Sequence, residues 1–177
     1  MIVPSITYFF TGVSPAPLDS VIIISVHSFV FPQIITNFAV TMDIIRLNGE
    51  DKKLYELVAP LIMNPAIIKQ NNNYPYKTEK DYIWYIATDA DKVEGFMPLK
   101  PTLAGYHIDN YYINDNKQET IAQLIETILE EHSNSNKITA LVKKPHVKEF
   151  KKSGFSTWLE LKLYTKMDYK NLEKKQE

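Results

Sequence analysis

The stretch GYHIDNYYINDNKQETIAQLIETILEEH, residues 105–132, decides the fold. Its first part, residues 106–113, is rich in aromatic and β-branched residues and predicts a buried strand. After a polar loop, apolar residues recur at the spacing of one helix face, at Ile121, Leu124, Ile125, Ile128 and Leu129. Asn116 and Glu119 have the spacing of a capping box, which would leave the other N–H groups of the first turn free. A strand that leads into such an open helix N-terminus is suited to binding an anion such as a pyrophosphate.

Composition limits the classes of function that the chain can have. Its 177 residues are 45% hydrophobic and 23% charged, which fits one globular domain with a core. The formal net charge of −1 does not favour a nucleic-acid or membrane partner. The absence of cysteine excludes disulfides, thiolate metal sites and a cysteine nucleophile. No metal site is predicted, because the four histidines are far apart and show no metal-ligand spacing. They are His27, His107, His132 and His146.

The first 41 residues differ in composition from the rest. They contain one charged side chain, Asp19, whereas residues 42–177 carry all 20 basic residues. Residues 21–41 are long enough to cross a bilayer, but they include polar side chains and have no basic flank before Arg46. A secretory signal would need a positive n-region, which residues 1–5 lack. Three interpretations stay open: a non-core extension from a mis-called start, a membrane or targeting segment, and a packed extension.

From residue 42 onward the order of elements is readable. The pattern predicts a strand at 44–47, a helix capped by Asn48, a second helix opened by Asn64 and Pro65, strands at 82–87 and 93–99, the strand and helix of the opening stretch, a strand at 137–142, helical turns at 147–153 and a last strand at 155–167. The order is therefore β-α-α-β-β-β-α-β-α-β. Residues 42–168 are expected to form the domain, and residues 169–177 a charged tail.

Two local sequences in this order resemble a known family. Residues 107–113, HIDNYYI, are similar to a fourth strand that commonly reads E-L-x-x-L-x-V. Residues 150–155, FKKSGF, are similar to Y-x-K-x-G-F, which precedes the last strand. Together they resemble the GNAT superfamily of N-acetyltransferases, and the match spans residues 43–167.

The resemblance implies an α+β fold of three layers, in which helices cover both faces of a mixed, mostly antiparallel central sheet. The sheet would splay between its fourth and fifth strands, and acetyl-CoA would lie in the opening. The pantetheine would pair with the backbone near Tyr111, Tyr112 and Ile113. The pyrophosphate would bind the N–H groups that open the long helix, where the helix dipole favours negative charge.

The cofactor loop departs from the family pattern, which reads Q/R-x-x-G-x-G/A. The matching residues, which are our candidate cofactor site, are Lys117, Gln118, Glu119, Thr120, Ile121 and Ala122. Lys117 keeps a cation, but Gln118 and Thr120 stand where glycines usually let the backbone approach the diphosphate. Glu119 adds a negative charge that opposes phosphate unless it turns back to the cap. We therefore expect an affinity for CoA that is lower than usual, or absent.

The catalytic candidates depart from the family as well. Relatives commonly protonate the leaving thiolate with the tyrosine of Y-x-K-x-G-F, but Phe150 cannot donate, so Tyr111, Tyr112 or a water would replace it. The frequent glutamate at the start of the fourth strand is replaced by His107, and an imidazole is suited to accepting a proton from an ammonium substrate near neutral pH. Asp109 would orient this imidazole from the same face of a regular strand, whereas a bulge would change the geometry. A purely structural role for His107 is the alternative.

Three functions from different classes are compatible with these residues. The first is an acyl-CoA-dependent N-acyltransferase that acetylates an amine of a small molecule or a protein. The second is a catalytically inactive GNAT-fold module for binding or assembly, favoured by the missing glycines and tyrosine. The third is a GNAT-like protein that acts on or binds nucleic acid, which rests only on the lysines of residues 143–152.

We expect the first function, in the cytoplasm. Nucleic acid is not expected as a partner, and a membrane is expected only if residues 21–41 are a genuine membrane segment. The oligomeric state stays open, with a homodimer as one alternative.

Overall fold

The computed structural model describes residues 42–132 and 137–169. Of the predicted tail, residues 169–177, only Tyr169 is described, as the last residue of a strand. The interpretations offered for residues 1–41 concern a segment outside the described range. Within it, no helix combines the length and the apolar character needed to cross a membrane.

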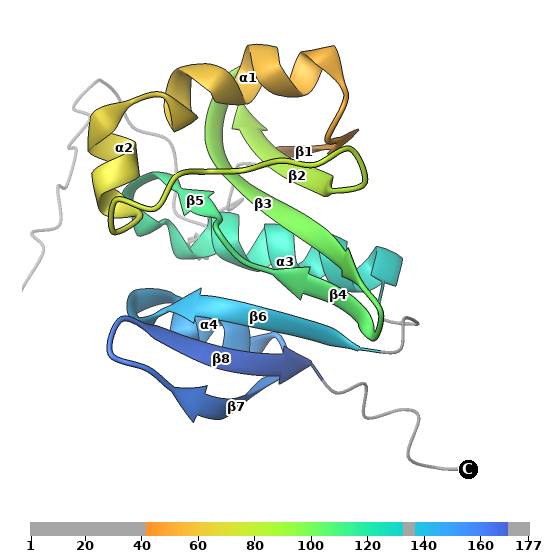
Figure 1. Cartoon of the computed structure of the whole chain (residues 1–177), viewed down its shortest axis with the longest axis vertical. Coiled ribbons are helices and arrows are strands. Elements are labelled where there is room, and N and C mark those ends of the chain that lie inside the picture. The colour runs from red at the N-terminus through yellow and green to blue at the C-terminus, as the bar shows by residue number, and fades with distance from the viewer. Residues whose placement is uncertain (1–41, 133–136, 170–177) are drawn as a thin grey trace, which may run out of the picture. The chain divides into compact units, whose positions relative to one another are not determined.

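The described strands form one mixed sheet (Figure 1). Their order is β1-β2-β3-β4-β6-β8-β7, and β5 pairs with β3. The pairing of β4 with β6 is parallel, and the other described pairings are antiparallel. The strands are β1 (Asp43–Asn48), β2 (Ile83–Asp89), β3 (Lys92–Thr102), β4 (Gly105–Ile108), β5 (Tyr112–Ile113), β6 (Ile138–Lys143), β7 (Phe155–Glu160) and β8 (Tyr164–Tyr169). The prediction of a mixed, mostly antiparallel sheet is confirmed.

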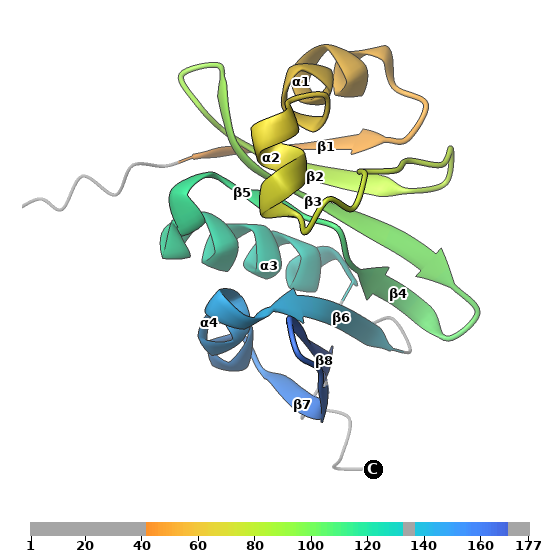
Figure 2. The same cartoon turned by 60° about the vertical axis from the view of Figure 1, so that its left-hand side comes forward.

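Helices cover both faces of this sheet, as predicted (Figure 2). One face carries α1 (Lys52–Ile62) and α2 (Pro65–Gln70), and the other carries α3 (Gln118–His132) and α4 (Val147–Lys152). Two short 3-10 helices, η1 (Asn114–Asn116) and η2 (Lys144–His146), precede α3 and α4.

The core has one part on each face of the sheet. Leu54 of α1 belongs to a buried cluster with Ile86 and Phe96 of the central strands. Tyr85 belongs to a second cluster, which includes Leu124 of α3. Because neighbouring residues of a strand point to opposite faces, the adjacent Tyr85 and Ile86 contribute to different clusters.

The strand predicted at residues 106–113 is interrupted. β4 ends at Ile108 and β5 begins at Tyr112, and Asn110 between them has a φ of 53°. Asparagine adopts this left-handed conformation more readily than most residues. We call residues 109–111 the bulge.

The last strand, predicted as one element over residues 155–167, is a hairpin. β7 ends at Glu160, and β8 begins at Tyr164. The N–H of Leu161 donates to the carbonyl of Tyr164 at 2.8 Å and closes the turn. Leu161 and Leu163 are exposed at this turn, so the apolar alternation that suggested a single strand continues through a chain reversal.

Of the helix caps predicted at Asn48 and Asn64, the second is correct. Oδ1 of Asn64 accepts from the N–H of Ala66 at 2.9 Å, and Pro65 opens α2. The cap predicted at Asn48 is wrong, because Asn48 is the last residue of β1 and α1 is preceded by Asp51. The N–H of Asn48 donates to the carboxylate of Asp51 instead.

Candidate functional site

The sheet opens between β4 and β6. β4 and β6 pair in parallel from Tyr106 and Ile138 to Ile108 and Ala140. Beyond this point β5 pairs with β3, and residues 141–143 of β6 pair with β8. The prediction that the two strands splay is confirmed. We call the opening between β5 and residues 141–143 the crevice.

Two cavities lie at the crevice. The first has a volume of about 430 Å³, and its lining includes β5, Asn116 and η2. The second has a volume of about 380 Å³, and its lining includes the bulge and Leu141. Asn72 and Lys143 line both cavities, so the two spaces adjoin.

A chain of hydrogen bonds runs along the wall of the crevice. Oη of Tyr111 lies 2.9 Å from Nδ1 of His146, and Nε2 of His146 lies 2.8 Å from Oδ1 of Asn116. Because an amide oxygen only accepts, Nε2 carries the proton and Nδ1 accepts from the tyrosine hydroxyl. That hydroxyl accepts in turn from the backbone N–H of Lys143 at 3.1 Å. The chain therefore joins the bulge and the end of β6 to the loop before α3.

Burial keeps this chain uncharged. His146 is 2% exposed and Tyr111 is 1% exposed. Burial lowers the pKa of His146 to about 4, and the charge of Lys143 adds to this effect. Burial also raises the pKa of the Tyr111 hydroxyl well above its ordinary value. At neutral pH the tyrosine is thus a donor and the neutral imidazole accepts at Nδ1.

The first turn of α3 presents free N–H groups. Lys117 precedes the helix with φ −57° and ψ 116°, and its carbonyl accepts from the N–H of Ile121 at 3.3 Å. For the N–H groups of residues 118–120, no acceptor is found in the described part of the chain. Three unpaired donors at the positive end of a 15-residue helix form an environment that stabilises an anion.

The predicted capping box is wrong. Oδ1 of Asn116 accepts from His146 rather than from an N–H of the first helical turn. Glu119 is exposed, and its carboxylate makes no hydrogen bond or ion pair with any described residue. The N-terminus of α3 therefore stays open, but the negative charge of Glu119 lies in its first turn.

Several side chains of the predicted cofactor loop lie away from the crevice. Thr120 and Ile121 are buried, and Oγ1 of Thr120 lies 3.4 Å from Sδ of Met42. Ala122 lines a surface hollow shared with α4. Gln118 is exposed and lines neither crevice cavity. None of these four side chains lines either crevice cavity.

The cation of the predicted cofactor loop is held by a buried carboxylate. Nζ of Lys117 lies 2.6 Å from Oε2 of Glu94, which is 2% exposed. Lys92 and Asn114 also bind this carboxylate, at 2.8 and 2.9 Å. These partners, Lys117 foremost, lower the pKa of Glu94 to about 2. Because Lys117 is paired with Glu94, its ammonium group is a weaker partner for a phosphate than that of a free lysine would be.

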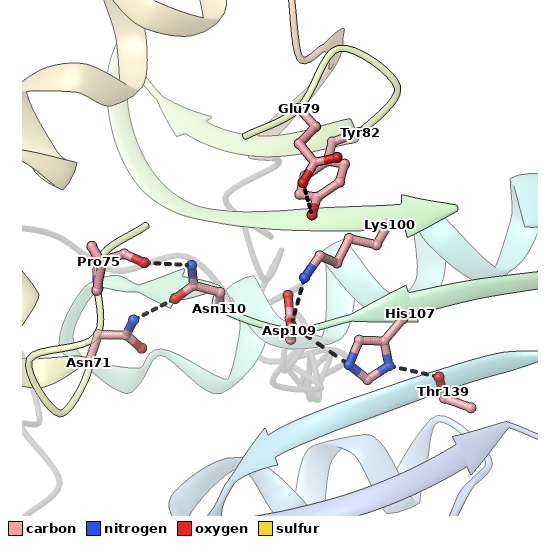
Figure 3. A network of polar contacts seen from close by, with 9 residues as sticks. All are labelled: Asn71, Pro75, Glu79, Tyr82, Lys100, His107, Asp109, Asn110 and Thr139. Carbon is pink, nitrogen blue, oxygen red and sulfur yellow. Dashed lines mark hydrogen bonds and ion pairs between the residues drawn. The ribbon is translucent and has the colours of Figure 1, made fainter. Parts of the chain in front are cut away.

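The candidate base, His107, is a residue of β4 that pairs with Lys100 of β3 on one side and with Thr139 of β6 on the other (Figure 3). Nδ1 of His107 lies 2.7 Å from Oγ1 of Thr139, which donates its own proton to the carbonyl of Tyr106 at 3.3 Å. Nδ1 therefore carries the proton, and Nε2 keeps its lone pair. Asp109 lies 3.8 Å from Nε2, and its Oδ2 accepts from Lys100 at 3.1 Å.

This geometry revises the role predicted for Asp109. Thr139, not Asp109, fixes the orientation of the His107 ring, because 3.8 Å is too long for a hydrogen bond. Burial lowers the pKa of His107, and the nearby charge of Asp109 opposes this shift. Asp109 lines the second cavity, whereas His107 lines neither cavity.

The bulge is anchored to the loop after α2. Nδ2 of Asn71 donates to Oδ1 of Asn110 at 2.5 Å, and Nδ2 of Asn110 donates to the carbonyl of Pro75 at 3.2 Å (Figure 3). These contacts hold the left-handed backbone of Asn110 in place. They also make the loop after α2 a wall of the second cavity.

Solved structures of other proteins share the fold of this chain. ElaA from Escherichia coli aligns with a TM-score of 0.57 at 13% identity, over 72% of this chain and 99% of ElaA. An acyl-CoA N-acyltransferase from Pseudomonas aeruginosa aligns with a TM-score of 0.57 at 15% identity, over 73% of this chain and 100% of that protein. The chain has the GNAT acyltransferase fold.

A third solved structure, aminoglycoside 6′-acetyltransferase type Ii, aligns with a TM-score of 0.54 at 14% identity, over 72% of this chain and 96% of that protein. No protein-family model and no curated protein matches the sequence. The predicted GNAT fold is thus confirmed by likeness of structure.

Phe150 occupies the tyrosine position of the GNAT motif and is fully buried. Its ring centroid lies 5.9 Å from that of Tyr111 and 5.2 Å from that of Phe155. Of the two tyrosines considered as replacement donors, Tyr111 has its hydroxyl at the end of β6. The hydroxyl of Tyr112 donates to Asn114 at 3.3 Å instead.

Sequence reasoning missed three residues of this GNAT-fold crevice. Lys143 and His146 lie within the basic stretch of residues 143–152, and Asn116 is predicted only as a helix cap. Their local sequence carries no signal of the contacts that they make. One positional clue existed: residues 143–146 directly follow the strand that borders the splay.

Proposed function

We propose that the protein is an acyl-CoA-dependent N-acyltransferase that transfers an acetyl group from acetyl-CoA to an amine. The observation that carries this proposal is the crevice with its two adjoining cavities. A thioester entering through the first cavity and an amine entering through the second would meet beside the bulge. The structures that share the fold include a protein named as an acyl-CoA N-acyltransferase and one named as an aminoglycoside acetyltransferase.

Three features in the first cavity or next to Asn116, which lines it, suit CoA. The edge of β5 that faces β6 is free of strand pairing, so the amides of the pantetheine can bond to the backbone of Tyr112 and Ile113. The open N-terminus of α3 offers its N–H groups to the pyrophosphate. Among the described residues, the lining contains Lys143, Lys144 and Lys162 and no carboxylate.

Three features oppose tight binding. Glu119 brings a negative charge to the first turn of α3, and Glu94 neutralises Lys117. In addition, the hydrogen bond between Asn116 and His146 joins the loop before α3 to η2 beside the first cavity. We therefore expect acetyl-CoA to bind, but with less affinity than a glycine-rich loop would provide.

The residues present can supply the proton transfers. Nε2 of His107 accepts a proton from the amine, directly or through water, and Asp109 stabilises the resulting imidazolium. The neutral amine attacks the thioester carbonyl, whose developing oxyanion is stabilised by backbone N–H groups of the bulge. The C–S bond then breaks, Tyr111 protonates the thiolate, and the proton that the new amide nitrogen loses restores the tyrosine hydroxyl.

The proposal is tested by binding of acetyl-CoA to the full chain. At one hundred times its dissociation constant, the cofactor should add about 2.7 kcal/mol to the free energy of unfolding, seen as a rise in Tm. Because the chain contains no cysteine, a thiol reagent reports only the CoA released during turnover. No change in Tm at millimolar acetyl-CoA would remove the transferase proposal and leave the fold as a binding module.

A matched pair of variants shows where the pyrophosphate binds. Gln118 is the first residue of α3, a position that tolerates proline, and the extended ψ of Lys117 is compatible with a following proline. Gln118→Pro removes one free N–H and should weaken acetyl-CoA binding. Gln118→Ala keeps that N–H and should bind as the wild type does. Equal binding by the two variants would place the pyrophosphate elsewhere.

A further inference from the structure

Lys143 is placed between the two cavities of the crevice. It is the last residue of β6, beyond the part of this strand that pairs with β4. Its side chain is half-buried and lines both cavities. Nζ lies 5.5 Å from the ring centroid of Tyr111, so the amine rests over a wall of the crevice. A group that lines both spaces is exposed to whatever enters either of them.

No described carboxylate forms an ion pair with this lysine. Among the described residues that line the two cavities, Asp109 is the one carboxylate. Its Oδ2 lies 3.1 Å from Nζ of Lys100. The other titratable groups among the described residues that line these spaces are Tyr74, Tyr111, Tyr112, Tyr164, His146, Lys144 and Lys162, none of which is a carboxylate.

Burial without a counter-charge lowers the pKa of Lys143 to about 8. A substantial fraction of its side chain is therefore the neutral amine at pH 7.5 to 8. An ordinary lysine, with a pKa of about 10.4, is neutral in only about one molecule per thousand at pH 7.5. The neutral amine is the nucleophilic form.

We infer that Lys143 is itself an acyl acceptor, modified at Nζ by acetyl-CoA bound in the first cavity. This inference rests on the proposed function, because it needs the thioester in the crevice. The neutral Nζ attacks the thioester carbonyl and forms a C–N bond, and the C–S bond breaks. The proton lost from Nζ passes to the departing thiolate, so the products are an Nε-acetyl-lysine and free CoA. No oxidant, metal or other reactant is needed.

The modification would act on the same crevice. An acetyl amide at Nζ removes the charge of Lys143 and adds volume where the two cavities adjoin. The acylated chain should therefore bind fresh acetyl-CoA more weakly than the unmodified chain. In this way Lys143 would limit turnover when no amine substrate is present.

The chain offers a matched control in Lys166 of β8. Its Nζ lies 5.2 Å from the ring centroid of Trp158, so it also rests over an aromatic ring, and it is half-buried. Lys166 lines neither crevice cavity. Stacking on a ring is therefore common to both lysines, whereas access to the crevice is specific to Lys143.

The test is incubation of the full chain with acetyl-CoA at pH 8, followed by intact mass and peptide mapping. We expect one addition of about 42 Da, located at Lys143, at a rate at least about tenfold that at Lys166. The Lys143→Arg variant should lose this addition and keep its Tm, whereas Lys166→Arg should keep the addition. Parallel labelling with p-nitrophenyl acetate, a small ester that does not need the CoA site, measures the intrinsic reactivity of both lysines.

The outcomes separate this inference from the proposed function. A rise in Tm with acetyl-CoA but no acetylation of Lys143 overturns the inference and leaves the transferase proposal intact. Labelling of Lys143 by the small ester alone also overturns it, because the bound thioester then does not reach Nζ. Equal acetylation of Lys143 and Lys166 indicates non-specific chemistry and overturns it as well. Absence of any rise in Tm removes the proposed function and the inference together.

Discussion

Tyr111 and His146, 35 residues apart in the chain, share a hydrogen bond of 2.9 Å in the wall of the crevice. The hydroxyl donates to Nδ1, and the opposite nitrogen of the ring donates to Asn116. The bulge is thereby connected through one imidazole to the loop that opens α3. The hydrogen bond thus links the proposed place of reaction with the proposed place of pyrophosphate binding.

Removing this hydroxyl should destabilise the fold. Tyr111→Phe leaves Nδ1 of His146 without a donor and the N–H of Lys143 without an acceptor, so the free energy of unfolding should fall by about 1–3 kcal/mol. Tyr112→Phe is the matched control, because its hydroxyl makes one long bond of 3.3 Å to Asn114, and it should lose less than about 1 kcal/mol. Urea unfolding measures both, and equal losses would contradict the buried chain.

The depressed pKa of His146 should make stability depend on pH. The unfolded histidine binds a proton below about pH 6.5, but the folded one does so only below about pH 4. Stability from this residue is therefore complete above pH 6.5 and is lost as the pH falls toward 4, by up to about 3 kcal/mol. His146→Gln should remove this part of the slope. Urea unfolding of the wild type and of His146→Gln at pH 7 and pH 4.5 tests this prediction. His107 and His132 are present in both proteins, so their effect on stability cancels in the comparison.

Glu94 should have opposite effects on stability and on binding. Glu94→Gln breaks the contacts with Lys117 and Lys92 and should cost about 1–3 kcal/mol at pH 7. It also releases Lys117, so acetyl-CoA should bind more tightly. Glu119→Gln is the control: it removes an exposed charge from the first turn of α3 and should improve binding with little loss of stability. Weaker acetyl-CoA binding by Glu94→Gln in calorimetry would show that Lys117 needs its partner to be positioned.

Restoring the family's glycine at position 120 should not help the cofactor. The methyl carbon Cγ2 of Thr120 packs so closely over Gly95 that a Cβ added there would lie 3.0 Å from it. Thr120→Gly should cost about 2 kcal/mol, through lost packing and the entropy of a helical glycine, with unchanged affinity for acetyl-CoA. Gln118→Gly, in the same turn but exposed, should lose only about 1 kcal/mol. Tighter cofactor binding by Thr120→Gly would mean that the threonine does obstruct the diphosphate.

The pH dependence of turnover should report on His107. Burial lowers the pKa of this imidazole, so activity should rise with pH through a value below the ordinary 6.5 or so. His107→Gln should flatten this limb of the profile of kcat/KM, measured by release of the CoA thiol. Thr139→Val removes the acceptor that orients Nδ1 and should lower kcat while keeping the limb. A profile unchanged by His107→Gln would assign the histidine a structural role.

Local sequence alone determined most of the secondary structure. The period of apolar residues located α3, and Asn64 with Pro65 marked the start of α2, because these signals depend on neighbours three or four positions away. Gly154 follows α4 with a φ of 92°, a conformation that glycine adopts readily because it has no Cβ, so its residue type is itself a signal for the end of this helix. The likeness of two motifs to the GNAT pattern was sufficient to predict the fold.

Only the tertiary structure decided how the crevice is built. The break after Ile108 depends on Asn71, which bonds to Asn110 from 39 residues away. Lys117 turns to Glu94 because β3 brings a buried carboxylate beside the loop. Lys143 lines both cavities because the pairing of β6 with β4 ends at Ala140. The residues next to Lys143 in the sequence do not indicate that its side chain is half-buried. Contacts between segments that are distant in sequence set the charges and hydrogen bonds of the site. The spacing of apolar residues, which depends on near neighbours, does not predict these contacts.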